Sequence, residues 1–182
     1  MRTDPEITHR RIIEIATEVF GHHGTEASLN EIAKRAAVGP GTLYRHFPSR
    51  EHLIDACMEN WEAQLQAAAQ RAASSNRRPA VLLLQWFEDF ATHISTYRGG
   101  PARLLRALHG SEALWARRWD VLQSANAAVF DRLTGMDAVR ADTDARLLCV
   151  LVCGVAATAE EGNLDAAQRR ALLQVIVSGT LC

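Results

Sequence analysis

The chain of 182 residues is poor in aromatic residues, proline, glycine and cysteine. Aromatic residues make up 6% of it, and it has 5 prolines and 11 glycines against 30 alanines. Alanine has the highest intrinsic helix propensity, whereas glycine and proline interrupt helices. With 48% hydrophobic and 23% charged residues, the composition is typical of a globular protein and neither disordered nor fibrous. It therefore predicts helices and argues against an all-β fold.

The sequence also lacks an excess of charge of either sign, since 20 Lys and Arg face 21 Asp and Glu. A nucleic-acid site would have to come from local asymmetry of charge. The four cysteines, at 57, 149, 153 and 182, form no C-x-x-C pair, which favours a reducing compartment and no metal site.

No long hydrophobic run is present. The longest, Leu147 to Ala159, has 13 residues, which is short of the ~20 needed to cross a bilayer, so it predicts a buried helix. The residues MRTDPEITHRR contain no apolar signal region. We expect a cytoplasmic protein without membrane contact.

The first fifty residues carry the start and stop signals of three helices. Asp4 with Pro5 predicts a helix start, followed by an apolar stripe that ends at Gly24. The segment 28–31 has the spacing of a capping box and opens a second helix. A third helix is predicted from residue 39, ended by the break at 48–49, after which a fourth begins.

Two short helices with so tight a connection, supported by a longer one, predict a helix-turn-helix. Leu43 and Phe47, four residues apart, would hold the second short helix against the core. Its other side chains would then point partly outward, where a DNA major groove could receive them. This outward set is rich in hydrogen-bond donors and contains no acid: Thr42, Tyr44, Arg45 and His46.

Residues 10–54, RRIIEIATEVFGHHGTEASLNEIAKRAAVGPGTLYRHFPSREHLI, resemble the N-terminal DNA-binding domain of TetR/AcrR-family transcriptional regulators. The run GTLYRHFPSRE is the most specific part of this resemblance. The resemblance implies a homodimer whose two recognition helices enter successive major grooves of a palindromic double-stranded operator. It also implies a C-terminal helical domain that binds a small-molecule inducer and releases the DNA, most often in a repressor.

The same resemblance implies which residues contact DNA. Tyr44 and His46 would mainly hold phosphates, and Arg45 could pair with a guanine, worth about 1–3 kcal/mol of discrimination. Ser28 and Arg50 lie at helix N-termini, where free N–H groups suit a phosphate. The full set of expected contacts is Ser28, Gly39, Pro40, Gly41, Thr42, Tyr44, Arg45, His46 and Arg50.

Two departures from the family pattern bear on DNA binding. Ala37 stands where the family usually has the glycine of the turn. Either it adopts a left-handed conformation, which costs a non-glycine residue ~1–2 kcal/mol, or the turn differs slightly here. Pro40 replaces a commonly basic residue. They leave open an interaction protein that kept the fold but lost DNA binding. A generic three-helix subdomain would explain the apolar positions but not the whole pattern.

An enzyme is the other alternative. The sequence contains no nucleophile–base constellation, paired carboxylates or phosphate loop that we can identify, so we expect no enzyme, no cofactor and no metal. Glu6 and His9 have the Glu-x-x-His spacing of carboxylate-bridged metal bundles, but only one copy is present.

Beyond the third helix, the patterns predict helices at about 49–73, 80–97, 101–109, 111–134 and 143–161, and a last one that starts at Asn163 or Asp165 and runs to Gly179. The expected fold is therefore all-α, with about nine helices. It comprises a helix-turn-helix domain of residues 1–52 and a helical ligand-binding and dimerisation domain of residues 53–182. The helix at 49–73 begins in one domain and ends in the other, so it can transmit movement.

The helix at 143–161 is apolar on almost every side and has to be buried. One of its faces can meet its own core and the other a second chain, together with the last helix. The residues expected at this dimer interface are Leu147, Leu151, Val155, Leu172, Ile176 and Gly179. The alternative is that both helices only complete the core of the monomer.

Aromatic residues at helical spacing, together with a few polar ones, could form a ligand pocket. The expected set is Trp86, Phe90, His93, Tyr97, Arg106, His109, Trp115 and Trp119. Equally, the aromatics could be plain core and the two basic residues could lie on the surface. Cys149 and Cys153 share a helix face and are best interpreted as small core residues rather than a thiol sensor.

Overall fold

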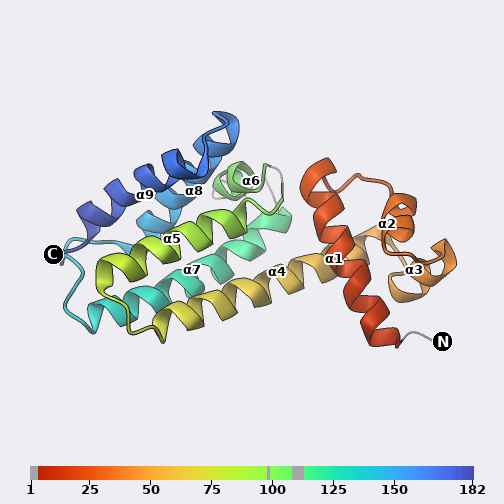
Figure 1. Cartoon of the computed structure of the whole chain (residues 1–182), viewed down its shortest axis with the longest axis horizontal. Coiled ribbons are helices and arrows are strands. Elements are labelled where there is room, and N and C mark those ends of the chain that lie inside the picture. Colours follow the sequence, from red (N-terminus) through yellow and green to blue (C-terminus); the bar gives the residue numbers. More distant parts are fainter. Residues whose placement is uncertain (1–3, 98, 108–112) are drawn as a thin grey trace. The chain divides into compact units, whose positions relative to one another are not determined.

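The computed structural model describes residues 4–97, 99–107 and 113–182, without the side chains of residues 103, 106, 107 and 113–117. Within these residues it contains nine helices (Figure 1). They are α1 (Pro5–His23), α2 (Leu29–Arg35), α3 (Pro40–His46), α4 (Arg50–Ala73), α5 (Pro79–Ile94), α6 (Gly100–Ala107), α7 (Ala113–Thr134), α8 (Ala145–Glu161) and α9 (Ala166–Thr180). The prediction of an all-α fold with about nine helices is confirmed.

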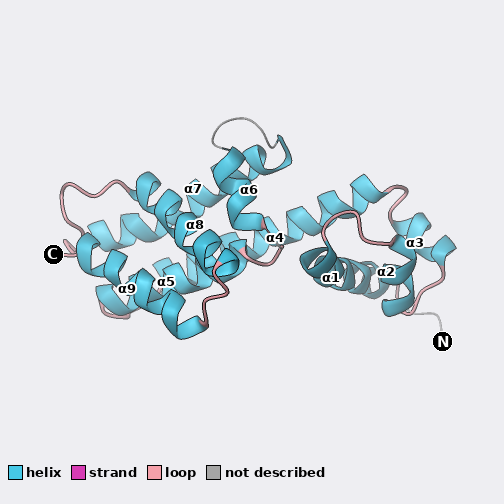
Figure 2. Cartoon of the chain, turned by 90° about the horizontal axis from the view of Figure 1, so that it is seen from above, coloured by secondary structure: helices cyan, strands magenta, loops and turns pink. Residues whose placement is uncertain are grey.

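Loops and turns join the helices (Figure 2). In the described part of the chain, the β-type pairing consists of one isolated antiparallel bridge between Val139 and Leu181. No helix among the described residues combines the length and the apolar character that crossing a membrane requires.

The chain divides into two compact units. The first comprises Met1–Trp61 and Thr96–Arg98, and the second comprises Glu62–Ser95 and Gly99–Cys182. Helix α4 therefore contributes its N-terminal half to the first unit and its C-terminal half to the second. The domain boundary expected near residue 52 stays a prediction.

Most helix ends lie where the sequence places them. The Asp4 carboxylate accepts the Glu6 N–H at 2.9 Å at the start of α1, and Gly24 follows its end with φ +79°. The capping box predicted at Ser28 is wrong, because the Ser28 side chain makes no capping hydrogen bond with α2. A capping box does form at α9, where Asp165 and Gln168 exchange side-chain hydrogen bonds with each other's backbone N–H.

Helix α8 is central to the second unit, because it contacts α5, α6, α7 and α9. Its inward face consists of small residues, among them Cys149, Val152 and Cys153, which let these helices approach closely. A polar link crosses the same core: the Trp86 indole donates to Asn126 Oδ1 at 3.0 Å, and the Asn126 amide donates to the Ala145 carbonyl at 2.6 Å.

A close approach in the first unit depends on a glycine. A Cβ added to Gly21 of α1 would lie 2.6 Å from the carbonyl oxygen of Thr96. The next residue, Tyr97, is buried, and its hydroxyl donates to the Cys57 carbonyl at 3.4 Å. Gly21 thus allows the segment 96–97 to pack within the first unit.

We expect Gly21→Ala to lower the free energy of unfolding by about 1–3 kcal/mol, because the Thr96 carbonyl would have to move. The ordinary effect has the opposite sign, since replacing glycine by alanine inside a helix raises the free energy of unfolding by up to about 1 kcal/mol. Gly41→Ala in α3 is the control, since a Cβ there meets no atom within 4 Å. Urea denaturation followed by circular dichroism measures both, and a Gly21→Ala protein as stable as Gly41→Ala would contradict the prediction.

Candidate nucleic-acid interface

Helix α3 presents an apolar side to the core and a polar side to solvent. Leu43 and Phe47 are 1% and 2% exposed, whereas Tyr44 is 48% exposed and Arg45 is also exposed. Thr42, like His46, is half-buried. The predicted division between the inward and the outward side chains of this helix is confirmed.

One hydrogen bond within the helix joins two of the outward side chains. The Arg45 guanidinium donates to the Thr42 hydroxyl at 3.1 Å, one turn earlier. Gly39, Pro40 and Gly41, which begin the helix, are exposed and bring the backbone to the surface. Because none of these residues carries a negative charge, the exposed side of α3 is suited to contact with a polyanion.

The turn between α2 and α3 is a Schellman motif. The Val38 N–H donates to the Ala33 carbonyl at 2.9 Å, and the Ala37 N–H donates to the Lys34 carbonyl at 3.1 Å. Ala37 occupies the left-handed position of this motif, with φ +51°. Of the two alternatives that the sequence leaves open at Ala37, the structure therefore shows the strained left-handed one.

Two arginines brace the segments before and after α2, a role that sequence reasoning did not find. Arg11 donates from Nε to the Ala36 carbonyl at 2.7 Å, and its Nη2 contacts the same oxygen. Arg50 donates to the carbonyls of Thr25 and Ala27, both at 2.7 Å. None of these contacts has a sequence signature, because each joins two residues more than twenty positions apart in the chain.

A histidine outside the predicted set lies beside α3. The imidazole of His9, on α1, stacks on Phe47 with ring centroids 4.6 Å apart and lies 5.8 Å from the imidazole of His46. Partial burial lowers the pKa of His46, and the positive charges of His9 and Arg45 lower it further. The predicted contact Ser28 is exposed at the start of α2.

The aromatic residues predicted to line a ligand pocket do not all lie together. Trp86 and Phe90 are buried side by side, with ring centroids 5.5 Å apart, while Tyr97 belongs to the first unit. His93 and Trp119 are half-buried. His109 and the side chains of Arg106 and Trp115 lie outside the described residues, so the pocket stays a prediction.

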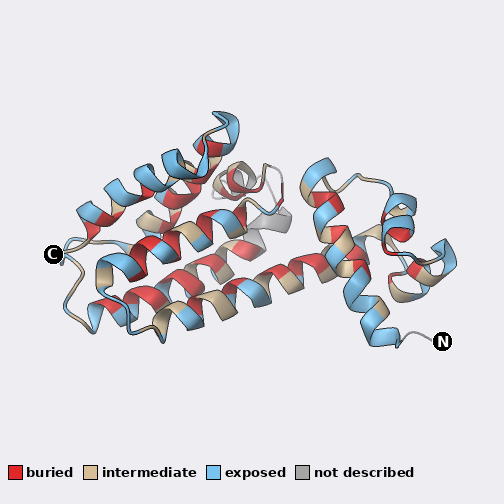
Figure 3. Ribbon diagram, in the orientation of Figure 1, coloured by how far each residue is buried: buried red, intermediate tan, exposed pale blue. Residues whose placement is uncertain are grey.

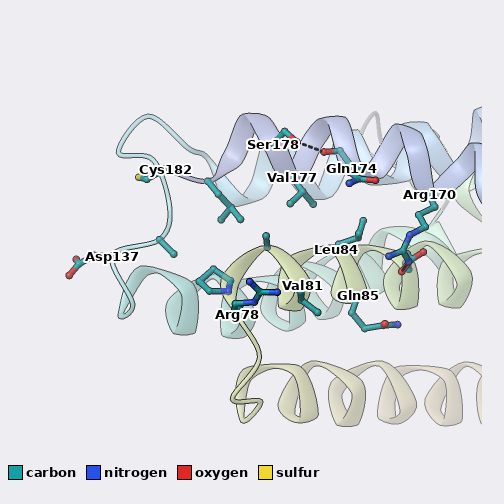
Figure 4. Close-up of a pocket in the computed structure, with 15 residues that line it drawn as sticks. Arg78, Val81, Leu84, Gln85, Asp137, Arg170, Gln174, Val177, Ser178 and Cys182 are labelled. Carbon is teal, nitrogen blue, oxygen red and sulfur yellow. Dashed lines mark hydrogen bonds and ion pairs between the residues drawn. The ribbon is translucent and has the colours of Figure 1, made fainter.

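A hollow of about 700 Å³ lies between α5 and α9, where sequence reasoning predicted no site. Figure 4 shows Leu84 from α5 and Val177 from α9 pointing into the space between the two helices. Arg170 forms an ion pair with Glu88 at 2.5 Å along its wall. No sequence pattern could indicate this hollow, because its lining comes from segments far apart in the chain.

Burial lowers the reactivity of three of the four cysteines. Cys57, Cys149 and Cys153 are buried, and none of the four cysteines forms a disulfide. Burial raises the pKa of the Cys57 thiol to about 11, and a hydrogen bond with Cys149 together with burial raises the pKa of Cys153. Thiols held in this protonated form are poor nucleophiles and poor metal ligands.

Helices α8 and α9 contact each other, and both carry exposed large apolar side chains, whose surface is referred to below as the α8/α9 face. Its four most exposed large side chains are Leu147, Leu151, Leu172 and Val175, at 66%, 50%, 39% and 72%. In Figure 3 much of the length of α9 is coloured as exposed. The predicted interface residues Val155 and Ile176 are half-buried, and Gly179 is exposed.

Comparison with known proteins agrees with this arrangement. The sequence model described as "Bacterial regulatory proteins, tetR family" matches residues 12–57, and the model described as "Transcriptional regulator SbtR-like, C-terminal domain" matches residues 78–181. The crystal structure of the TetR transcriptional regulator SCO0520 from Streptomyces coelicolor is 30% identical, with a TM-score of 0.75. The superposition covers 95% of this chain and 98% of that one.

Curated relatives match over shorter stretches. The HTH-type transcriptional regulator UidR of Escherichia coli K12 is 46% identical over 57 residues, which are 31% of this chain and 29% of UidR. The HTH-type transcriptional regulatory protein RaaS of Mycobacterium tuberculosis is 32% identical over 119 residues, 65% of this chain and 53% of RaaS. This chain thus spans from about three tenths to about half of the length of these two relatives.

The left-handed conformation of Ala37, in the turn between α2 and α3, leads to a testable prediction about stability. We expect Ala37→Gly to raise the free energy of unfolding by about 0.5–1 kcal/mol, because glycine relieves a left-handed strain of ~1–2 kcal/mol and loses part of it to the greater freedom of the unfolded chain. Ala36→Gly is the matched control, since Ala36 has φ −73° and is buried, and this change should destabilise. Thermal unfolding of the two variants measures both signs, and a stability loss in Ala37→Gly would refute the strain.

Proposed function

Because the chain belongs to the TetR family of bacterial regulatory proteins, we propose that it is a ligand-responsive repressor that binds a palindromic DNA operator as a homodimer and leaves it when a small molecule binds. The relatives are transcriptional regulators, which are not enzymes, in agreement with the expectation from sequence. The proposed place of action is the cytoplasm, where the operator lies.

The observation that carries the proposal is the polar face of α3. Its two anchors, Leu43 and Phe47, are buried, so Tyr44 and Arg45 are directed outward by a helix that cannot rotate without exposing them. In this position α3 acts as the recognition helix, with Arg45 reading a base edge. Tyr44 and His46 contact the phosphates on either side.

Dimerisation through the α8/α9 face brings two recognition helices to one operator. Exposed leucines and a valine on two helices that contact each other are costly in water, and a second copy would cover them by an isologous contact. Two recognition helices must then be spaced to reach half-sites one DNA turn, ~34–36 Å, or a multiple of it apart.

Release follows from the position of α4, which contributes residues to both compact units. A ligand that binds one arrangement of the second unit better than another shifts the population toward it. Through α4 this shift alters the spacing of the two recognition helices, and simultaneous docking on both half-sites is lost. The predicted aromatic set and the hollow between α5 and α9 are the two candidate places for such a ligand.

The experiment that tests DNA recognition begins with the full chain and a library of random duplexes, from which bound sequences are selected and read. We expect an inverted repeat. Selection of no duplex above background would overturn the proposal in favour of an interaction protein that lacks DNA binding.

On the selected duplex, we expect Arg45→Ala to weaken binding by about 1–3 kcal/mol, which is about 5- to 150-fold in Kd, and to relax the preference at one base pair of each half-site. Arg132→Ala, which removes an exposed arginine near the end of α7, is the control for loss of positive charge alone. Fluorescence anisotropy measures the Kd of each folded variant. Equal affinity of Arg45→Ala and the unchanged chain would remove Arg45 from the interface.

We expect Leu151→Glu to raise the Kd of dimerisation by about a hundredfold or more, because each dimer would bury two unpaired carboxylates. Ile7→Glu is the matched control, since Ile7 is exposed to a similar extent, 57% against 50%, and lies on α1 in the first compact unit. Analytical ultracentrifugation measures the change. A dimer unaffected by Leu151→Glu would place the interface elsewhere.

A further inference from the structure

A second hollow lies in the first unit, between α1 and α3, and has a volume of about 640 Å³. Four polar side chains line it, those of Thr8, Thr42, Arg45 and His46, together with the turn segment 37–39. Two hydroxyls, a guanidinium and an imidazole can all donate hydrogen bonds to an anion. The acids in the first turn of α1, Asp4 and Glu6, do not line the hollow.

We propose that this hollow binds one phosphate of the DNA backbone and that the His9–His46 pair takes up a proton when the phosphate enters. The inference rests on the proposed function and deepens it, because it makes the strength of DNA binding depend on pH. It assigns a role to His9 and Thr8, which lie outside the recognition helix.

The geometry explains why the proton is taken up on binding rather than before. The His9 and His46 rings are 5.8 Å apart, and His9 is held in place by its stack on Phe47. Two imidazolium ions at this separation repel each other, and Arg45 adds a third positive charge. These are the charged groups that act on His46, from α1 and from its own helix, and together with partial burial they keep its pKa below the ordinary value.

A phosphate reverses this balance. Its negative charge favours the imidazolium form of His46 and raises its pKa in the complex. The complex therefore binds more protons than the free protein. By linkage, the affinity for DNA must rise as the pH falls through the range that separates the two pKa values, by at most tenfold per pH unit for one proton.

The test measures the Kd of the full chain for the duplex recovered by the selection above, at constant salt, from about pH 8 to about pH 6. We expect the unchanged chain to bind about three- to tenfold more tightly at the lower pH. His46→Gln keeps a hydrogen-bond donor but cannot take up a proton, so we expect its Kd to change much less between pH 8 and pH 6 than that of the unchanged chain, whatever its affinity at pH 8. A merely structural role of His46 would instead weaken binding equally at every pH.

Two further variants test whether His9 contributes to the pH dependence and whether the effect is specific to this pair of histidines. His9→Phe keeps a ring that can stack on Phe47 but removes the neighbouring charge, so we expect a smaller dependence on pH. His22→Gln, at the exposed end of α1, is the control and should behave as the unchanged chain. An equal pH dependence in His46→Gln and the unchanged chain would overturn the proposal.

A second measurement does not depend on any variant. The NMR titration of the His46 imidazole, free and bound to the duplex, should give a higher pKa in the complex, by about one unit if the affinity changes tenfold. An unchanged pKa would overturn the proposal. Binding that is specific but independent of pH defeats the phosphate inference alone, whereas failure to select any duplex defeats the proposed function.

Discussion

A helix of seven residues has too few internal hydrogen bonds to be stable by itself, and the function proposed for α3 depends on overcoming this limit. Burial of Leu43 and Phe47 supplies most of the stabilisation, since each buried side chain contributes about 1.5–3 kcal/mol. The same two contacts determine which side chains face outward. One apolar anchor pair therefore sets both the stability of the helix and the composition of its exposed face.

The loop before α2 and the turn that follows it are held by polar contacts of a different kind. Arg11 and Arg50 each donate to backbone carbonyls that their own loops leave free, and hydrogen bonds from charged donors contribute about 1.5–3 kcal/mol. These contacts offset the strain at Ala37. They also show that an arginine near a helix start can support the scaffold, so a position typical of phosphate contact does not by itself assign that role to Arg50.

In the second unit, α8 meets four other helices through small residues on one face and carries Leu147 and Leu151 on the other. An apolar helix could have been buried on all sides within one chain. Because α9, which contacts α8, also carries exposed apolar side chains, Leu172 and Val175, the arrangement favours a second copy over a solitary monomer. The hydrophobicity of these side chains is the same in a monomer and in a dimer, so it is their exposed fractions that argue for a second copy.

Much of the fold could be predicted from sequence because its signals are local. Asp4 before Pro5, Gly24, Pro48 and Asp165 mark helix ends through contacts within a few residues, and the apolar periods of α1 and α3 predict the buried faces. Ser28 is the counterexample, since its spacing is that of a capping box and the hydrogen bonds are absent. A spacing can place a helix start without determining the rotamer that completes the cap.

The sequence by itself determined the helix class and the outward face of α3, because each depends on neighbours along the chain. Only the tertiary structure decided that Arg11 and Arg50 brace the loops, that His9 lies against His46, and that Gly21 admits the segment at Thr96. These pairs are separated by tens of residues. No local pattern encodes such a distance, so they exist only once the helices have packed.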